Sequence, residues 1–202
     1  METSGILRAT LAATVGILAG WQQAEAVQLA DGTVYFVQPP SLLAATTTFN
    51  DACAWSATYY FTVNLPENAG EPLQRVVINQ HEGVEDVDFR WEESRAFVGV
   101  RRKKGEDLPI QEVTTDEKTR SIAIAFDPPI APGKTVTIAL EPVRNPCFGG
   151  VYLFGVTAFP PGEKVHGQFL GFGRFHFYLN GAIHLPVSFA VPGDELRPAN
   201  SD

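Results

Sequence analysis

Residues 145–178 read NPCFGGVYLFGVTAFPPGEKVHGQFLGFGRFHFY and decide the fold of this chain. Successive side chains of a β-strand point to opposite faces, and in residues 151–159 both sets of alternate positions are apolar. Strands that are apolar on both faces are buried on both faces, so we expect this segment to be a central strand. Gly150 permits a positive backbone dihedral before the strand, and Pro160 ends it.

Apolar residues elsewhere in the chain repeat with a period of two, which is typical of half-buried antiparallel strands. The apolar positions of residues 57–65 are Ala57, Tyr59, Phe61, Val63 and Leu65. Residues 122–126 and 136–140 show the same alternation on either side of a proline- and glycine-bearing turn, so we predict that they form a hairpin. Further strands are expected at residues 33–38, 73–80, 87–91 and 96–102. The best helix signal is a short turn near residues 42–45.

Many short strands separated by proline and glycine turns predict an all-β chain, an immunoglobulin-like antiparallel β-sandwich. A closed β-barrel is the alternative. We expect residues 27–191 to form this domain. Residues 192–202 are acidic, contain proline and have few apolar side chains, so we expect a disordered C-terminal tail.

The N-terminal segment predicts export. Residues 9–20 form an apolar run after Arg8, and Ala24 and Ala26 stand at the positions that a signal peptidase inspects. Residues 1–26 are therefore expected to be a signal peptide. A retained anchor is the alternative, but a run of about 12 apolar residues falls short of the ~20 needed to span a bilayer. We expect the mature chain to have no membrane span and to reside in the periplasm, the cell envelope or a lumen.

The chain has two cysteines, Cys53 and Cys147. Since an exported chain meets an oxidising compartment, we expect these residues to form one disulfide. Two buried free thiols are the alternative.

The charge of the chain argues against nucleic acid as a partner. There are 15 basic and 23 acidic residues; removal of Arg8, Glu2 and Glu25 leaves 14 and 21, a formal charge of −7. A negative net charge repels phosphate backbones and anionic membrane surfaces. The RRKK run at residues 101–104 is followed by Gly105, Glu106 and Asp107, so we interpret it as a charged hairpin tip that prevents edge-to-edge pairing.

Arg174, His176 and Tyr178 are the best candidates for a binding site. An unbroken strand over residues 166–178 would place them on one face, where they could bind an anion or the carboxylate of a partner. Three glycines in this segment favour a bulge that would interrupt the alternation. The alternative interpretation is an edge strand whose polar face is simply solvated.

Metal binding, catalysis and sugar binding have weaker support. No two of the four histidines stand at a ligand spacing of i, i+2 or i, i+4, so we expect no metal site and no cofactor, with a periplasmic copper or other metal-binding protein as the alternative. The chain lacks a nucleophile elbow and a phosphate-binding glycine loop, so we expect no enzyme. A carbohydrate-binding module is a further alternative, which solvent-facing Trp55 or Trp91 would favour.

Several blocks resemble the cyanobacterial domain-of-unknown-function family numbered 2808. They are LADGTVYFVQPP (29–40), ATTTFN (45–50), ATYYFTVNLPENAGEPLQRV (57–76), FDPPIAPGKTVTIAL (126–140), NPCFGGVYLFGVTAFPPG (145–162) and GQFLGFGRFHFY (167–178). The resemblance implies a small exported protein of uncharacterised activity and assigns no functional residue. Our hypothesis is therefore a non-enzymatic exported domain that binds another protein or an envelope component.

Overall fold

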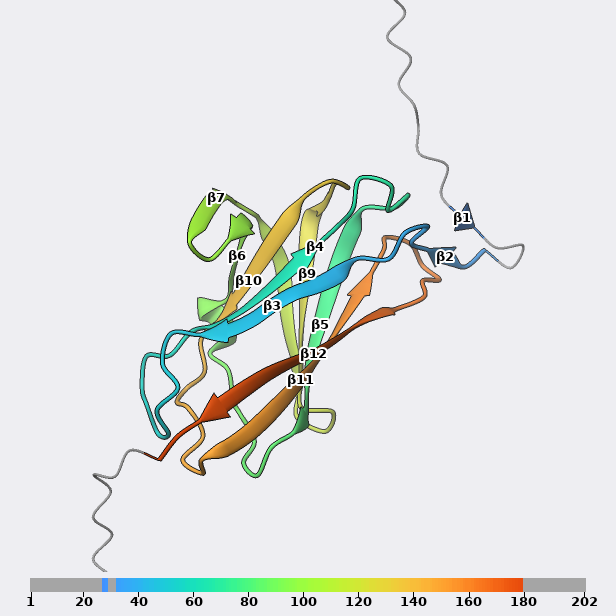
Figure 1. The fold of residues 1–202 in the computed structure, drawn as a ribbon. Helices are drawn as coiled ribbons and strands as arrows, with labels where there is room; N and C mark the ends of the chain where they lie inside the picture. Colours follow the sequence, from blue (N-terminus) through green and yellow to red (C-terminus); the bar gives the residue numbers. More distant parts are fainter. Residues whose placement is uncertain (1–26, 29–31, 180–202) are drawn as a thin grey trace, which may run out of the picture.

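Alternating apolar side chains place residues 41–177 in two five-stranded antiparallel sheets (Figure 1). The computed structural model describes Val27–Gln28 and residues 32–179. The predictions for the signal peptide, the C-terminal tail and the domain boundary at residue 191 lie outside the described residues. No helix in the described part is long and apolar enough to cross a membrane.

Sheet one has the strand order β3-β4-β10-β6-β7, and sheet two has the order β12-β11-β5-β9-β8. The strands of sheet one are β3 (Ser41–Thr47), β4 (Tyr59–Asn64), β10 (Thr135–Leu140), β6 (Arg95–Val100) and β7 (Lys103–Asp107). Those of sheet two are β12 (Gln168–Phe177), β11 (Gly150–Phe159), β5 (Leu73–Glu82), β9 (Ser121–Ile130) and β8 (Ile110–Asp116). The predicted immunoglobulin-like β-sandwich is confirmed, and the barrel alternative is wrong because the two sheets are separate.

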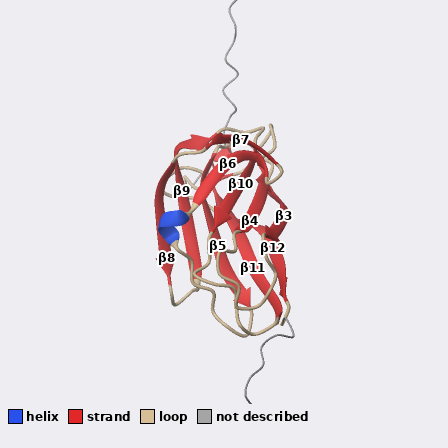
Figure 2. Ribbon diagram, turned by 90° about the vertical axis from the view of Figure 1, so that its left-hand side faces the viewer, coloured by secondary structure: helices blue, strands red, loops and turns tan. Residues whose placement is uncertain are grey.

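Figure 2 shows how completely strand dominates the described part of the chain. The one helical element there is the short 3-10 helix η1 (Trp91–Glu93), beside β8. A separate two-stranded ladder pairs β1 (Val27–Gln28) with β2 (Val34–Tyr35).

The core lies between the sheets and follows the predicted alternation. All five apolar positions of residues 57–65 are at most 1% exposed. The ring of Tyr59 stacks on Phe175 of the opposite sheet at a centroid distance of 4.8 Å and meets Phe154 edge to face at 6.0 Å. Aromatic pairs in these two geometries stabilise a core beyond the area that they bury. The prediction that β11 is a central strand is also confirmed, since it pairs with both β5 and β12.

Three local predictions are wrong. Residues 122–126 and 136–140 do not form a hairpin, because β9 pairs with β5 and β8 in sheet two, whereas β10 pairs with β4 and β6 in sheet one. Both strands bury their apolar face in the same core from opposite sides, and alternation alone does not distinguish that arrangement from direct pairing. Residues 42–45 belong to strand β3 rather than to a helical turn. Residues 87–91 hold only an isolated bridge at Phe89, followed by η1.

The edge strands β3 and β12 meet where the two sheets come together. A Cβ atom at Gly173 would lie 2.5 Å from the Cβ atom of Ala45 and 3.1 Å from a ring carbon of Phe61. Only a residue without a side chain fits this contact. The close approach brings the C-terminal end of β12 next to the loop that joins β3 to β4.

Candidate binding surfaces

Arg174, His176 and Tyr178 all face solvent on β12 and the residue just beyond it. Arg174 lies opposite Leu153, and His176 lies opposite Val151, on the neighbouring strand β11. Among the described residues, none of the three side chains has a hydrogen bond or an ion pair. The structure therefore places the three side chains on one exposed surface, and their binding role stays a prediction.

The bulge expected from the glycines is present and changes the composition of this face. It lies between Val156 and Thr157 of β11, where Gly171 and Phe169 are the partners on β12, and Gly171 has a φ of +120°. Phe169 and Phe172 consequently both face outward, with ring centroids 5.0 Å apart. Leu170, which an unbroken strand would expose, packs against the core instead.

A second exposed surface lies at one end of the sandwich, and we call it the apolar end. It consists of residues in the 48–58, 83–90 and 141–149 loops and those that follow β12. Half of the large hydrophobic side chains exposed in the described part belong to it: Phe49, Trp55, Val84, Val143, Phe148, Tyr178 and Leu179. Exposed large apolar side chains are therefore concentrated at this end of the sandwich.

Backbone hydrogen bonds hold the segments of the apolar end together. Ala52 N–H donates to the carbonyl of Tyr178 at 2.8 Å, and Val143 N–H donates to the carbonyl of Asp88 at 2.8 Å. The 48–58 and 141–149 loops are joined covalently as well, because Cys53 and Cys147 form the predicted disulfide. The alternative of two free thiols is therefore wrong.

Asn145 fastens the same loops from inside the core. Its side chain is fully buried, and its Nδ2 donates to the carbonyls of Phe49 at 3.1 Å and Asp51 at 2.9 Å. Its Oδ1 accepts from the hydroxyl of Tyr59 at 3.0 Å. A buried amide with all these bonds rigidifies the loop, since leaving any one unmade would be costly. Burial raises the pKa of Tyr59 far above its ordinary value, so this hydroxyl stays protonated and remains a donor.

Glu85 fastens the outer side of the apolar end. Its carboxylate accepts from the backbone N–H of Cys147 at 2.7 Å and pairs with Arg144 at 3.1 Å. Burial, followed by the nearby charge of Glu85, raises the pKa of Tyr152, whose hydroxyl donates to the carbonyl of Phe148 at 3.0 Å. The exposed rings of Trp55 and Phe148 therefore stand on a backbone that is held in place around them.

Trp55 and Trp91 both face solvent, with exposed fractions of 67% and 50%. Trp55 belongs to the apolar end. Trp91 lies on η1 and lines a separate hollow of about 250 Å³, which Asp88, Glu117 and Arg120 also border. Solvent exposure of Trp55 or Trp91 is the feature that would favour a carbohydrate-binding module, and both rings are exposed.

Two acidic residues of the 82–88 segment make contacts within the fold. Glu85 holds the 141–149 loop, and Asp86 pairs with Arg120 at 3.0 Å. Within the described ranges, no three His, Cys, Asp or Glu side chains gather in a way that could hold a metal ion. His184 lies outside the described residues.

Sequence reasoning placed Arg174, His176 and Tyr178 on one surface but missed the exposed aromatic residues around the disulfide. Phe49, Trp55 and Phe148 are far apart in the sequence from Tyr178, and only tertiary contacts bring them together. One signal was available. Trp55 and Phe148 stand within two residues of the two cysteines, so the expected disulfide already predicts that they are neighbours.

Comparisons with known proteins give a family and distant similarities of fold. The family model described as "Protein of unknown function (DUF2808)" matches residues 33–177. No curated protein sequence matches the chain.

Solved structures of similar fold include the C-terminal domain of the antigen I/II-family protein AspA of Streptococcus pyogenes, with a TM-score of 0.41 and 14% identity over 66% of this chain and 46% of that chain. The C-terminal domain of the Streptococcus agalactiae AgI/II polypeptide BspA has a TM-score of 0.42 and 13% identity over 68% of this chain and 48% of that chain. A collagen-binding domain of a Staphylococcus aureus adhesin has a TM-score of 0.38 and 8% identity over 67% of this chain and 97% of that chain. The chain spans about half the length of the two streptococcal chains.

Proposed function

The chain belongs to the DUF2808 family of proteins of unknown function, and we propose that it is a non-enzymatic binding domain that holds a partner protein of the cell envelope at its apolar end. The observation that carries this proposal is the set of exposed aromatic residues on loops fixed by the Cys53–Cys147 disulfide and by buried Asn145. A rigid surface loses little conformational freedom on binding, so more of its contact energy appears as affinity.

The side chains at this end have the composition of a protein-binding surface. Aromatic residues dominate the energetics of protein interfaces because they bury large rings at small entropic cost. Trp55, Phe148 and Tyr178 provide such rings. Arg174 and His176 continue the surface along β12 and supply donors for carboxylates at its rim. The partner is therefore a protein with an apolar contact surface bordered by acidic residues.

The compartment in this proposal is extracytoplasmic. Disulfides persist in oxidising compartments and are rare in the cytosol, and this one joins two loops of the proposed surface. Periplasm, cell envelope and lumen all satisfy that condition. The cyanobacterial origin that the sequence resemblance implies remains a prediction.

The test begins with affinity capture of the tagged mature chain from its native envelope fraction. The captured partner is then purified and titrated against single variants. We expect Trp55→Ala and Phe148→Ala each to weaken binding about tenfold or more, which is ~1.4 kcal/mol or more, as is typical of central aromatic residues of an interface. Combined replacement of Arg174, His176 and Tyr178 by alanine is expected to abolish capture.

Trp91→Ala is the matched control, because Trp91 is also about half exposed but lies outside the apolar end. We expect this variant to bind the partner like the wild type. All of the replaced side chains face solvent, so the urea midpoint of each variant should stay near that of the wild type. Partner binding that survives in Trp55→Ala and Phe148→Ala would contradict the proposal.

Carbohydrate binding is the second candidate, and the exposed ring of Trp91 favours it. The hollow beside this ring is bordered by Asp88, Glu117 and Arg120, which could hydrogen-bond sugar hydroxyls. Titration with soluble polysaccharides tests this candidate. Binding that is lost in Trp91→Ala and kept in Trp55→Ala would support it, and the opposite pattern would exclude the Trp91 hollow.

A further inference from the structure

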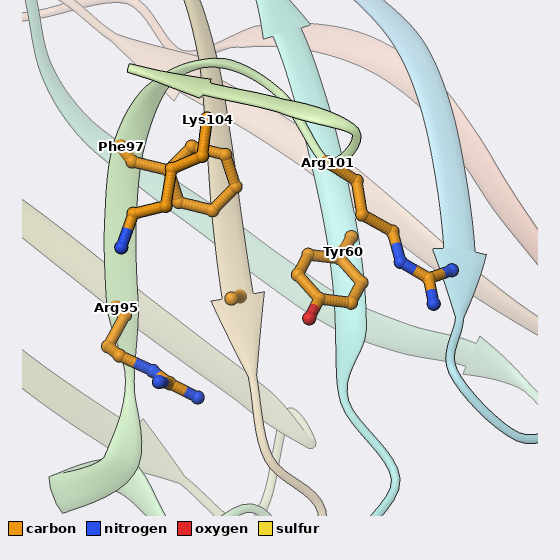
Figure 3. Close-up of a pocket in the computed structure, with 6 residues that line it drawn as sticks. Tyr60, Arg95, Phe97, Arg101 and Lys104 are labelled. Atoms are coloured by element: carbon orange, nitrogen blue, oxygen red, sulfur yellow. The ribbon is translucent and has the colours of Figure 1, made fainter. Parts of the chain in front are cut away.

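Arg101 and Lys104 of the RRKK run cover a small pocket on the outer face of sheet one. Arg101 and Arg102 form the predicted turn between β6 and β7, but the hairpin does not simply project into solvent. Arg101 and Lys104 lie over the outward-facing side chains of β4 and β6 (Figure 3). The pocket has a volume of about 130 Å³ and is lined by Tyr60, Arg95, Phe97, Arg101, Lys104 and Ala139.

Strand register places the floor of this pocket. Ala139 of β10 lies between Tyr60 of β4 and Arg95 of β6 in one row across the sheet, and Phe97 belongs to the next row. The small side chain of Ala139 leaves a hollow between the larger neighbours. Figure 3 shows Tyr60 on one side of the pocket and Phe97, Lys104 and Arg95 together on the other.

Cation–π contacts hold the basic groups at the pocket. The guanidinium carbon of Arg101 lies 4.9 Å from the centroid of Tyr60, and the ammonium nitrogen of Lys104 lies 5.4 Å from that of Phe97. Arg101 also donates to the carbonyl of Thr47 at 3.0 Å, which ties the hairpin to β3. The ring faces are thus occupied by cations, so a ligand would meet the ring edges, the Tyr60 hydroxyl and the charged donors.

The charge balance of the pocket suits one negative charge. Arg95 pairs with Glu141, and Lys104 pairs with Asp107 at 2.8 Å. Arg101 has no carboxylate partner among the residues that the structure describes. Three cations against two carboxylates leave an excess of one positive charge in a chain whose net charge is −8. A local excess of this size attracts a monoanion and does not compensate a polyanion.

We propose that this pocket binds a uronic acid residue, that is, a sugar ring bearing one carboxylate. The carboxylate accepts hydrogen bonds from Arg95 and Lys104, and its charge is balanced by Arg101, the cation of the pocket that has no carboxylate partner in the described part of the chain. The ring hydroxyls meet the Tyr60 hydroxyl and the carboxylate oxygens of Glu141 and Asp107. A peptide with several acidic side chains would be repelled by Glu141, Asp107 and the negative chain around them. The site shares no residue with the apolar end and does not depend on the proposed protein partner.

Titration of glucuronate into the full mature chain, followed by calorimetry or NMR, tests the pocket. Glucuronate is expected to bind at least about tenfold more tightly than glucose or glucuronamide, because only the carboxylate engages the cations. Binding should weaken as salt is raised. Arg95→Gln and Lys104→Gln should each weaken it about tenfold. Arg102→Gln, which removes the same charge from the same hairpin outside the pocket, should change it less than about twofold.

Glu141→Gln separates a binding role from a structural one. It removes a negative charge beside Arg95 while keeping an oxygen acceptor, so glucuronate should bind more tightly, the opposite sign to Arg95→Gln. Equal binding of glucuronamide and glucuronate would overturn the proposal, as would an equal loss in Arg102→Gln. A glutamate tripeptide that binds more tightly than glucuronate would also overturn it and would identify an acidic peptide site.

Discussion

The hydroxyl of Tyr59 donates a hydrogen bond to the side-chain oxygen of Asn145 at 3.0 Å inside the core. The two residues are 86 positions apart in the sequence. Tyr59 begins β4, and Asn145 lies in the loop before β11. Through its amide nitrogen, Asn145 also holds the carbonyls of Phe49 and Asp51. This one side chain therefore connects the sandwich core to the loops that carry the exposed aromatic residues.

Asn145→Ala should lower the free energy of unfolding by about 3 kcal/mol, because it leaves the Tyr59 hydroxyl and two loop carbonyls without their partner. Tyr59→Phe removes only one of the three bonds and should cost about 1 to 2 kcal/mol. Urea unfolding monitored by fluorescence measures both values. A larger loss in Tyr59→Phe than in Asn145→Ala would contradict this account.

Removal of the disulfide should destabilise the domain strongly. Cys53 and Cys147 are 94 residues apart, and closing a loop of that length stabilises by about 4 to 5 kcal/mol in the chain-entropy model. The double variant Cys53→Ser/Cys147→Ser should therefore unfold at a much lower urea concentration, and chymotrypsin should cut it near Phe49, Trp55 and Phe148. Mass measurement after alkylation, with and without reductant, checks the bond in the wild type. Two alkylated thiols without reductant would contradict it.

Glu71 should make the domain less stable as its carboxyl ionises. This residue is buried, and burial raises the pKa of its carboxyl above the ordinary value of 4.5. Because the folded-state pKa is raised, the protonated carboxyl is the form that the folded state favours. Its contribution to the free energy of unfolding is fully present below the unfolded-state pKa and is lost as pH rises through the folded-state pKa.

Glu71→Gln imitates the protonated form, so its urea midpoint should exceed that of the wild type at pH 7 and equal it near pH 3. Glu67→Gln, at an exposed position nearby, is the control and should give no such difference. A midpoint for Glu71→Gln below that of the wild type at pH 7 would show that the ionised carboxylate has a favourable role.

Gly173→Ala should disturb the contact between the two sheets. The added Cβ would lie 2.5 Å from that of Ala45, and overpacking of this kind costs about 1 to 3 kcal/mol. The double variant Gly173→Ala/Ala45→Gly restores the space and should recover part of the loss. Thermal unfolding of the single and double variants measures the difference. No recovery in the double variant would show that the cost arises elsewhere on β12.

The buried faces of the strands could be predicted from local sequence because alternation in an extended chain is a local property. Ala57, Phe61 and Leu65 are buried as their spacing predicts. The exposure of Arg174 and His176 follows from the same rule. The disulfide could be predicted because the chain has two cysteines, which can pair only with each other.

Tertiary structure alone decided which strands pair and which side chains meet. Ile124 and Ile138 bury similar surfaces from opposite sheets, and hydrophobic burial is non-directional, so their sequence pattern is the same as that of a hairpin. The pocket of Arg101, Tyr60 and Arg95 likewise depends on register across three strands and on a hairpin that folds over them. Alternation determines which way a side chain points, whereas its neighbour across the sheet is set by contacts between segments far apart in the chain.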